Sequence, residues 1–352
     1  MENLHIAYVR KSFYTHAMSV YGIGNPLIDF LCYADDSDLE KLSLHKGTML
    51  LVDEERRSVI LARMKDRKKN ISCGGSCPNT MVTLKMLGIE TTLAGGIGDD
   101  EYGEMYRSRL QEAGVKDETK VYHAATGTSI ILLTPDRERT MNTFLGANRL
   151  FDECDVDEES VKKATLFYFT GYMWDTQPQK RAVRKALSIA KANGVKVAFD
   201  LADPFAVGRY RSDFLDLLEN YCDIVLANSE EARFLSNNYD AYECCKSMGD
   251  LCNIAIVKDG KNGSYISNNR KITRIPLYGT TEPVDTTGAG DTYAAGFLYG
   301  YMKGYHPEEA GKIASFLAGE IITVMGAQFS KDRARELSEI IRQTFVLSSS
   351  LS

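Results

Sequence analysis

The sequence predicts an α/β fold with a doubly wound, mainly parallel sheet, helices on both faces and a small β-sheet lid. Two observations predict the main sheet. Apolar, strand-like runs alternate with segments of helical period, and several of these runs are apolar on both faces, as in a parallel sheet covered by helices on each side. A hairpin-like region that interrupts this alternation predicts the lid. The 352 residues, 44% of them apolar, allow one large domain with a smaller appendage.

The expected elements follow the chain in order. Strands are expected at residues 19–24, 48–52, 91–95, 166–170, 195–200, 223–227 and 253–258. Helices are expected at residues 54–69, 77–87, 101–113, 179–192, 213–220, 229–235, 289–303, 307–325 and 332–344. The runs at 195–199 and 224–227 are apolar on both faces, which is typical of strands inside a covered parallel sheet.

The lid is predicted from two strand-like runs, at residues 127–134 and 139–144, which a Pro-Asp-Arg-Glu turn joins. A short strand near 30–33 is expected to pair with them. We expect the lid to comprise about 28–52 and 120–146 and to cover the carboxyl ends of the main strands, where open α/β sheets bind ligands. The whole folded domain is expected at 18–345, with a peripheral extension at 1–17 and a tail at 346–352.

The composition argues against several classes of function. The net charge is −6 and the basic residues are scattered, so no nucleic-acid partner is expected. No stretch approaches the roughly 20 apolar residues of a membrane span, and no secretory signal is evident. The eight cysteines form no CxxC pair or zinc spacing, which predicts reduced thiols and a cytoplasmic location. Cys73 and Cys77 flank a glycine turn and are either redox-active or ordinary packing residues.

The segment 284–296, VDTTGAGDTYAAG, carries the chemistry. Gly288, Ala289 and Gly290 precede a predicted helix, so a phosphate can approach their backbone N–H groups closely. Asp291 lies in the first turn of that helix, where a carboxylate can take the proton of a hydroxyl that attacks a γ-phosphate. Thr287 is expected to support the phosphate loop. The alternative is an ordinary helix start with an acidic residue in its first turn.

The string from Asp285 to Asp291 resembles the C-terminal signature of the ribokinase-like, phosphofructokinase-B type carbohydrate kinases. Residues 73–79 resemble the N-terminal glycine region of that family, residues 95–103 its next block, and residues 228–231 its Asn-x-x-Glu motif. The resemblance covers roughly residues 19–330. It implies transfer of a phosphoryl group from ATP to a hydroxymethyl group, with Mg²⁺ as cofactor.

The resemblance also implies roles for the nucleotide end of the site. Asn228 and Glu231 would hold Mg²⁺ and its waters, although the same pair could simply be an N-cap with Glu at the third helical position. Residues 280–283 and 314–319 would border the adenine. Arg139 is a candidate to neutralise phosphate charge, or is an exposed arginine without a role. The loop expected to pass the ATP phosphates and ribose contains Lys258, Gly260 and Gly263.

The glycine region is expected to serve the acceptor. Gly74 and Gly75 would provide a hinge between lid and core, or only a turn. Asn79 would bind substrate hydroxyls, or cap the following helix. The opening at residues 22–29, which includes Asn25 and ends at Asp29, resembles that of adenosine kinases rather than ribokinases, and its Asp would bind a ribose diol.

The acceptor itself is left open by the sequence. Residues 166–174 also resemble an adenosine-kinase segment, in which Tyr172 and Trp174 would stack on a purine, the alternative being core packing. The leading hypothesis is an adenosine kinase, acting as a monomer or homodimer. The alternatives are a sugar kinase of the same family, for ribose, fructose or a keto-deoxy sugar acid, and a ligand-binding protein without catalytic activity.

Overall fold

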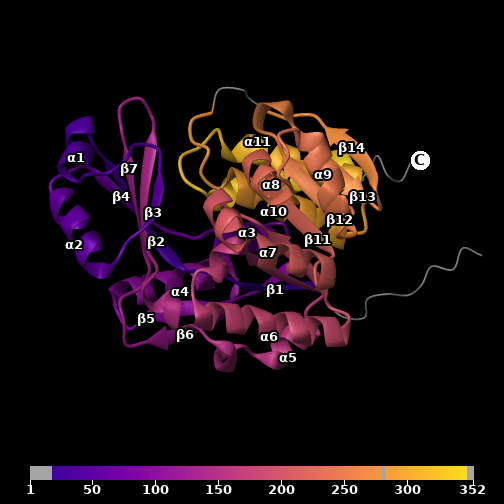
Figure 1. Cartoon of the computed structure of the whole chain (residues 1–352), viewed down its shortest axis with the longest axis horizontal. Coiled ribbons are helices and arrows are strands. Elements are labelled where there is room, and N and C mark those ends of the chain that lie inside the picture. The colour runs from indigo at the N-terminus through magenta and orange to yellow at the C-terminus, as the bar shows by residue number, and fades with distance from the viewer. Residues whose placement is uncertain (1–17, 280–282, 347–352) are drawn as a thin grey trace, which may run out of the picture.

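The computed structural model describes residues 18–279 and 283–346. The predicted extension at 1–17, the end of the predicted tail and three residues of the predicted adenine border, 280–282, lie outside this range. The described chain forms a large α/β body with a smaller sheet standing at one side, at the left of Figure 1. No helix in these two segments is both long and apolar enough to cross a membrane.

The main sheet has nine strands and is parallel except at one edge. Seven neighbouring strands pair in parallel, namely β6, β5, β1, β9, β10, β11 and β12. A C-terminal hairpin, β13 and β14, continues the sheet antiparallel. The order across the sheet is β14 (Lys271–Ile275), β13 (Ser264–Asn268), β12 (Ile254–Lys258), β11 (Ile224–Asn228), β10 (Lys196–Asp200), β9 (Leu166–Thr170), β1 (Ser19–Ile23), β5 (Glu90–Gly98) and β6 (Lys116–Tyr122).

Helices cover both faces of this sheet, because successive residues of its inner strands point to opposite sides. In β10, Ala198 packs into one hydrophobic cluster and Val197 and Phe199 into the other. One cluster holds α3 (Ser76–Met86), α4 (Glu101–Ala113), α10 (Ala289–Met302), α11 (Pro307–Ile321) and α12 (Lys331–Ile341); the other holds α5 (Glu158–Lys163), α6 (Gln177–Asn193), α7 (Pro204–Asn220), α8 (Ser229–Ser236) and α9 (Ala241–Gly249).

The smaller sheet is the lid that the hairpin predicted. Its five strands run in the order β3 (Met49–Leu51), β8 (Arg139–Phe144), β7 (Thr128–Leu133), β2 (Leu27–Tyr33) and β4 (Lys69–Gly74). Two helices, α1 (Asp36–Lys41) and α2 (Glu54–Arg63), belong to the same part of the chain (Figure 1). The fold class predicted from the sequence, including the lid, is confirmed.

Several expected elements differ from the observed ones. The helix expected at 54–69 ends at Arg63, and residues 69–74 form a lid strand that was not predicted. Residues 120–122, expected in the lid, belong to β6 of the main sheet. Strands β4, β6 and β14 are rich in polar residues and lie at sheet edges, and so they lack the apolar pattern on which the prediction depended.

Glycines form the junction where the chain passes between lid and body. Gly75, between β4 and α3, has φ +102°, and a Cβ there would lie 2.2 Å from the carbonyl oxygen of Asn25. Only glycine tolerates both this backbone conformation and this approach. The two lid crossings at residues 24–27 and 74–76 therefore pack against each other, which fixes β2 and the start of α3 at the same place.

Candidate active site

A cavity of about 730 Å³ lies between the lid and the carboxyl ends of the main strands. Both sheets and the start of α10 line it. Sixteen of the predicted site residues are among those lining it: Asn25, Asp29, Gly75, Asn79, Arg139, Tyr172, Asn228, Glu231, Lys258, Gly260, Gly263, Thr287, Gly288, Ala289, Gly290 and Asp291. Residues 315, 318 and 319 of α11, within the predicted adenine border, also line it.

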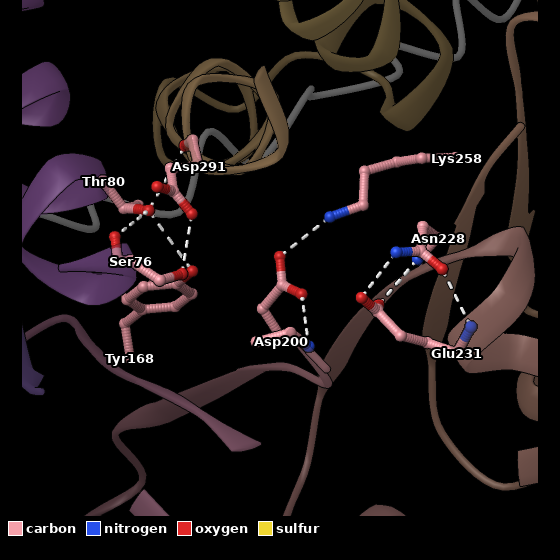
Figure 2. A network of polar contacts seen from close by, with 9 residues as sticks. Ser76, Thr80, Tyr168, Asp200, Asn228, Glu231, Lys258 and Asp291 are labelled. Atoms are coloured by element: carbon pink, nitrogen blue, oxygen red, sulfur yellow. Dashed lines mark hydrogen bonds and ion pairs between the residues drawn. The ribbon is translucent and has the colours of Figure 1, made fainter. Parts of the chain in front are cut away.

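Asp291 lies at the bottom of this cavity in the first turn of α10. Ser76 donates a hydrogen bond of 2.6 Å to one of its carboxylate oxygens (Figure 2). The amide of Asn79 donates one of 2.9 Å to the other. Burial raises the pKa of Asp291 to about 6, although both hydrogen bonds oppose that rise. A buried carboxylate that titrates just below neutral pH is suited to accept a proton from a substrate.

The backbone before Asp291 turns sharply into the start of α10 beside a buried lysine. Gly288 caps α10 with φ +74°, and a Cβ on Gly290 would lie 3.4 Å from the Nζ of Lys258. That ammonium group donates a 3.0 Å hydrogen bond to Asp200. Burial acts to lower the pKa of Lys258, but Asp200 and Glu231 outweigh it and the pKa is raised. A positive charge and a helix N-terminus therefore meet at this point.

Asn228 and Glu231 form a capping box at the start of α8. The Asn228 side chain accepts from the backbone N–H of Glu231 at 2.8 Å, and the Glu231 carboxylate accepts from the backbone and side-chain amides of Asn228 at 2.8 and 2.6 Å. The pair therefore forms the N-cap with Glu at the third helical position that was the alternative to a metal site. Burial raises the pKa of Glu231 well above its usual range, with Lys258 opposing.

These contacts limit how a metal ion could bind. Over residues 18–279 and 283–346, no group of three or more His, Cys, Asp or Glu side chains is placed to hold one. Glu231 already accepts hydrogen bonds on both carboxylate oxygens, so direct ligation by several protein groups does not fit. A hydrated Mg²⁺, bound mainly to phosphates and contacting carboxylates through water, does fit.

Asp29 lies at the lid side of the cavity, on β2. A Cβ on Gly74 would lie 2.1 Å from its carboxylate, so this glycine is required for the close approach of β4 to Asp29. Burial and the charge of Asp291 raise the pKa of Asp29 to about 7, and Arg139 opposes them. The two aspartates therefore repel each other electrostatically within one cavity.

Arg139 reaches from lid strand β8 to the phosphate loop. Its guanidinium lies 2.5 Å from a carboxylate oxygen of Asp285. Burial acts to raise the pKa of Asp285, but the N–H groups of Gly326 and Thr287 and the Arg139 guanidinium outweigh it, and the pKa is lowered. Arg139 is thus not a free hairpin arginine, because it joins the lid to the loop before α10.

Two of the predicted site residues, Gly74 and Trp174, do not line the cavity. Gly74 instead allows β4 to approach the carboxylate of Asp29. Trp174 is fully buried in the core, and its Nε1 donates a 2.7 Å hydrogen bond to Asp213. The predicted stacking of Trp174 on a purine is therefore wrong, because its ring faces Phe214 in T-shaped contact. Tyr172, two residues earlier, remains at the cavity.

The cysteines of the glycine turn are packing residues. Cys77 is buried, and burial raises its pKa well above the usual value. Burial also raises the pKa of the Cys73 thiol to about 12. Neither forms thiolate at neutral pH, so neither is activated for redox chemistry.

Comparison with known proteins identifies this architecture. Residues 52–334 match the description "pfkB family carbohydrate kinase". The chain belongs to this family. It is a kinase that acts on a carbohydrate or nucleoside, with the ATP use that membership implies.

Individual relatives of this pfkB kinase have different names. The crystal structure of adenosine kinase from Sinorhizobium meliloti is 34% identical, with a TM-score of 0.85 and coverage of 93% of this chain and 99% of that one. An uncharacterized sugar kinase from Archaeoglobus fulgidus is 34% identical over 70% of this chain and 96% of its own length. Adenosine kinase of Schizosaccharomyces pombe is 24% identical over 87% and 95%.

Three polar residues at the site of this pfkB kinase were missed from sequence. Ser76 bonds to Asp291, Asp200 to Lys258, and Gln328 to Asn79. A signal existed for Asp200, which ends a buried parallel strand, where functional side chains collect. No local pattern distinguished Gln328, which follows α11 and reaches the site only through the tertiary fold.

Proposed function

We propose that this kinase transfers the γ-phosphoryl group of ATP to the 5′-hydroxymethyl of a ribonucleoside, with adenosine as the acceptor. The observation that carries the proposal is an apolar slot beside Asp29, in the same cavity as Asp291. Lid and junction side chains form the slot: Leu27, Met49, Leu51, Ile131, Met141 and Leu145. A free pentose or hexose has no apolar surface to bury there, whereas a purine has two flat faces.

One polar group lies within this apolar lining. The hydroxyl of Ser129 on β7 is buried and has no hydrogen-bond partner among the described residues. A buried, unpartnered hydroxyl is unfavourable unless a ligand completes it. The edge of a base seated in the apolar slot carries the donors and acceptors that would do so. The relatives named adenosine kinase support the same choice.

The two aspartates would divide the chemistry. Asp29 accepts hydrogen bonds from the ribose diol and thereby places the 5′-hydroxyl near Asp291. Asp291 takes the hydroxyl proton as the oxygen attacks phosphorus. Ser76 and Asn79 hold the Asp291 carboxylate in place by donating to it. The proton acceptor is thus ionised near neutral pH and oriented before the acceptor binds.

Charge that develops on the phosphoryl group would be met by the start of α10. Gly288, Ala289 and Gly290 line the cavity, and the Nζ of Lys258 lies next to Gly290. The N–H of Ala289 donates to the carbonyl of Thr286, so the dipole of the helix start and the Lys258 ammonium would supply the positive potential. Arg139 would add a second positive charge from the lid. Mg²⁺ neutralises ATP phosphate charge when bound, and Glu231 and Asp200 would hold its waters.

A substrate screen tests this proposal. Purified protein with ATP and Mg²⁺ is offered adenosine, inosine, guanosine, ribose and fructose, and ADP release is followed. We expect adenosine to have the highest kcat/KM, and Asp29→Ala to raise its KM at least tenfold with a smaller change in kcat. Turnover of free sugars but of no nucleoside would reject the nucleoside assignment.

A sugar kinase of the same family is the second candidate. Its specific support is the 34% identity to the Archaeoglobus fulgidus protein, whose name is uncharacterized sugar kinase. Ribose, fructose or a keto-deoxy sugar acid would use Asp29 and Asp291 in the same way. Replacing Ser129 with Ala separates the candidates, because a sugar that does not reach the slot should be phosphorylated at an unchanged rate.

A further inference from the structure

A chain of hydrogen bonds leads away from Asp291 to the surface of α4. Asn79 donates to Asp291 at 2.9 Å, and the side-chain amide of Gln328 donates to the oxygen of Asn79 at 3.0 Å. Arg109 of α4 donates to the oxygen of Gln328 through Nε at 3.1 Å and through a terminal nitrogen at 2.5 Å. Three side chains from three segments therefore connect in series to the proposed base.

The direction of this chain is fixed at its outer end. A guanidinium can only donate, so the carboxamide oxygen of Gln328 must face Arg109. The amide nitrogen of Gln328 then faces Asn79 and requires its oxygen there. This leaves the amide nitrogen of Asn79 facing Asp291, which is the orientation that an ionised carboxylate needs. An Asn side chain has two nearly isosteric orientations, and here its neighbours select one of them.

Gln328 and Arg109 lie outside the cavity that holds Asp291. They line a neighbouring cavity of about 760 Å³, on the far side of Asn79. The segment that carries Gln328 also supports the phosphate loop: Gly326 donates to Asp285 at 2.8 Å, and Ala327 packs against Gly288. Gln328 is therefore placed to act on the base through Asn79 and not on the substrate.

We propose that Gln328, oriented by Arg109, is a positioning residue that holds the Asn79 carboxamide in the orientation that favours ionised Asp291. The proposal rests on the proposed role of Asp291 as the proton acceptor. Reversal of Asn79 would turn its oxygen toward the carboxylate, replacing a donor with a repulsive acceptor. The protonated, inactive form of Asp291 would then be favoured up to higher pH.

Other groups also set the ionisation of Asp291, and the hydrogen bonds of Gln328 within the described residues go instead to Arg109, Asn79 and the carbonyl of Cys73. The charged or titratable neighbours of Asp291 are Asp29 from the lid, Asp200 and Lys258 from the main strands, and Cys77, Tyr168 and Tyr172. Substitution of Gln328 leaves these groups in place. A change in pH dependence in the neutral variant Gln328→Met would thus report on Asn79, whereas Gln328→Glu also adds a negative charge that raises the pKa of Asp291 directly.

The experiment compares Gln328→Glu, Gln328→Met and a matched control. Glutamate keeps the pairing with Arg109 but presents only oxygens to Asn79, so it should reverse the carboxamide. Methionine removes the donor without imposing either orientation. The control, Arg107→Met, removes an arginine of the same helix that pairs with Asp117 at the surface. Thermal melting verifies that each variant is folded.

The readout is the pH profile of kcat with ATP and adenosine from pH 5 to 9. We expect the acid limb to move up by about one pH unit in Gln328→Glu and by about half a unit in Gln328→Met. All variants should converge within about twofold at pH 9, where Asp291 is ionised in each of them. Arg107→Met should match the parent protein.

An acid limb that stays in place in folded Gln328→Glu would overturn the proposal, as would an equal loss of kcat at every pH. A second measurement does not depend on turnover. In the ligand-free protein, the Asn79 side-chain amide resonance should titrate with Asp291, and Gln328→Glu should raise its midpoint. If Asp291→Asn is inactive but the Asn79 midpoint in Gln328→Glu equals that of the parent protein, only the positioning role of Gln328 is refuted. Full activity of Asp291→Asn would instead refute the proposed base.

Discussion

Asp291 combines two conditions that a proton acceptor needs. It is buried, which raises its pKa to about 6, and it receives two hydrogen bonds that keep it from rising further. A fully exposed aspartate would be a weaker base, and an aspartate without the Ser76 and Asn79 hydrogen bonds would have a higher pKa. The environment therefore sets both the strength of the base and its orientation.

Replacing Asp291 with Asn should lower kcat by about three orders of magnitude, because the amide cannot accept the hydroxyl proton. ATP binding should persist, since the backbone N–H groups and Lys258 are unchanged. Steady-state kinetics and nucleotide titration check the two halves. In the parent enzyme, kcat should decrease at pH values below about 6, because Asp291 becomes protonated there. Comparable turnover by the variant would remove Asp291 from its proposed role.

At the scale of elements, α10 joins the phosphate loop to the core. Its first turn carries Asp291, and its later turns pack against α11 through small residues. A Cβ on Gly296 would lie 2.8 Å from the Cα of Ala314, and one on Gly300 would lie 2.7 Å from Ala310. The two helix backbones therefore approach closely, which holds the first turn rigidly against the body of the protein.

Two glycines of the loop should respond differently to alanine. At Gly288, φ is +74° and the new methyl would lie 2.6 Å from Ala327, so unfolding in urea should show a loss of about 1–3 kcal/mol. At Gly290 φ is not positive and the nearest atom, the Nζ of Lys258, lies 3.4 Å away, so stability should change little. The methyl group would, however, intrude on the phosphate, and kcat/KM for ATP should fall at least tenfold. Equal destabilisation by both changes would contradict this distinction.

At the scale of the whole molecule, the lid and the body meet around buried acids. Asp29 comes from the lid sheet and Asp291 from the body, and their charges oppose each other within one cavity. The charge of Arg139, which pairs with Asp285 across the same junction, acts on Asp29 against this repulsion. Ionised Asp29 and Asp291 thus make this junction less stable than neutral groups at the same positions would.

Asp29→Asn should therefore stabilise the protein, and the gain should depend on pH. The folded pKa of Asp29 is raised to about 7 from an ordinary value of 3.8, so ionisation penalises only the folded state. The penalty is absent below about pH 4, grows as pH rises toward 7, and is constant above. We expect the melting temperature of the variant to exceed that of the parent by a few degrees at pH 8 and by little at pH 4.5. A gain that is the same at both pH values would contradict the assigned pKa.

The fold was predictable where the pattern was strong. Doubly apolar runs such as 195–199 and 224–227 specified central parallel strands, and the turn at 135–138 specified the lid hairpin. Polar edge strands such as Lys69–Gly74 were not predictable, because their pairing depends on a neighbour supplied by another part of the chain. The helix assigned to residues 64–69 was the result of that missing information.

The local sequence by itself determined the glycine-rich start of α10, with Asp291 in its first turn, because helix capping and close phosphate approach depend on adjacent residues. It also determined the family motifs that line the cavity. Only the tertiary structure decided that Trp174 belongs to the core, that Asp200 pairs with Lys258 and that Gln328 donates a hydrogen bond to Asn79. These contacts join residues far apart in the chain, and their partners are selected by how helices and strands pack in space.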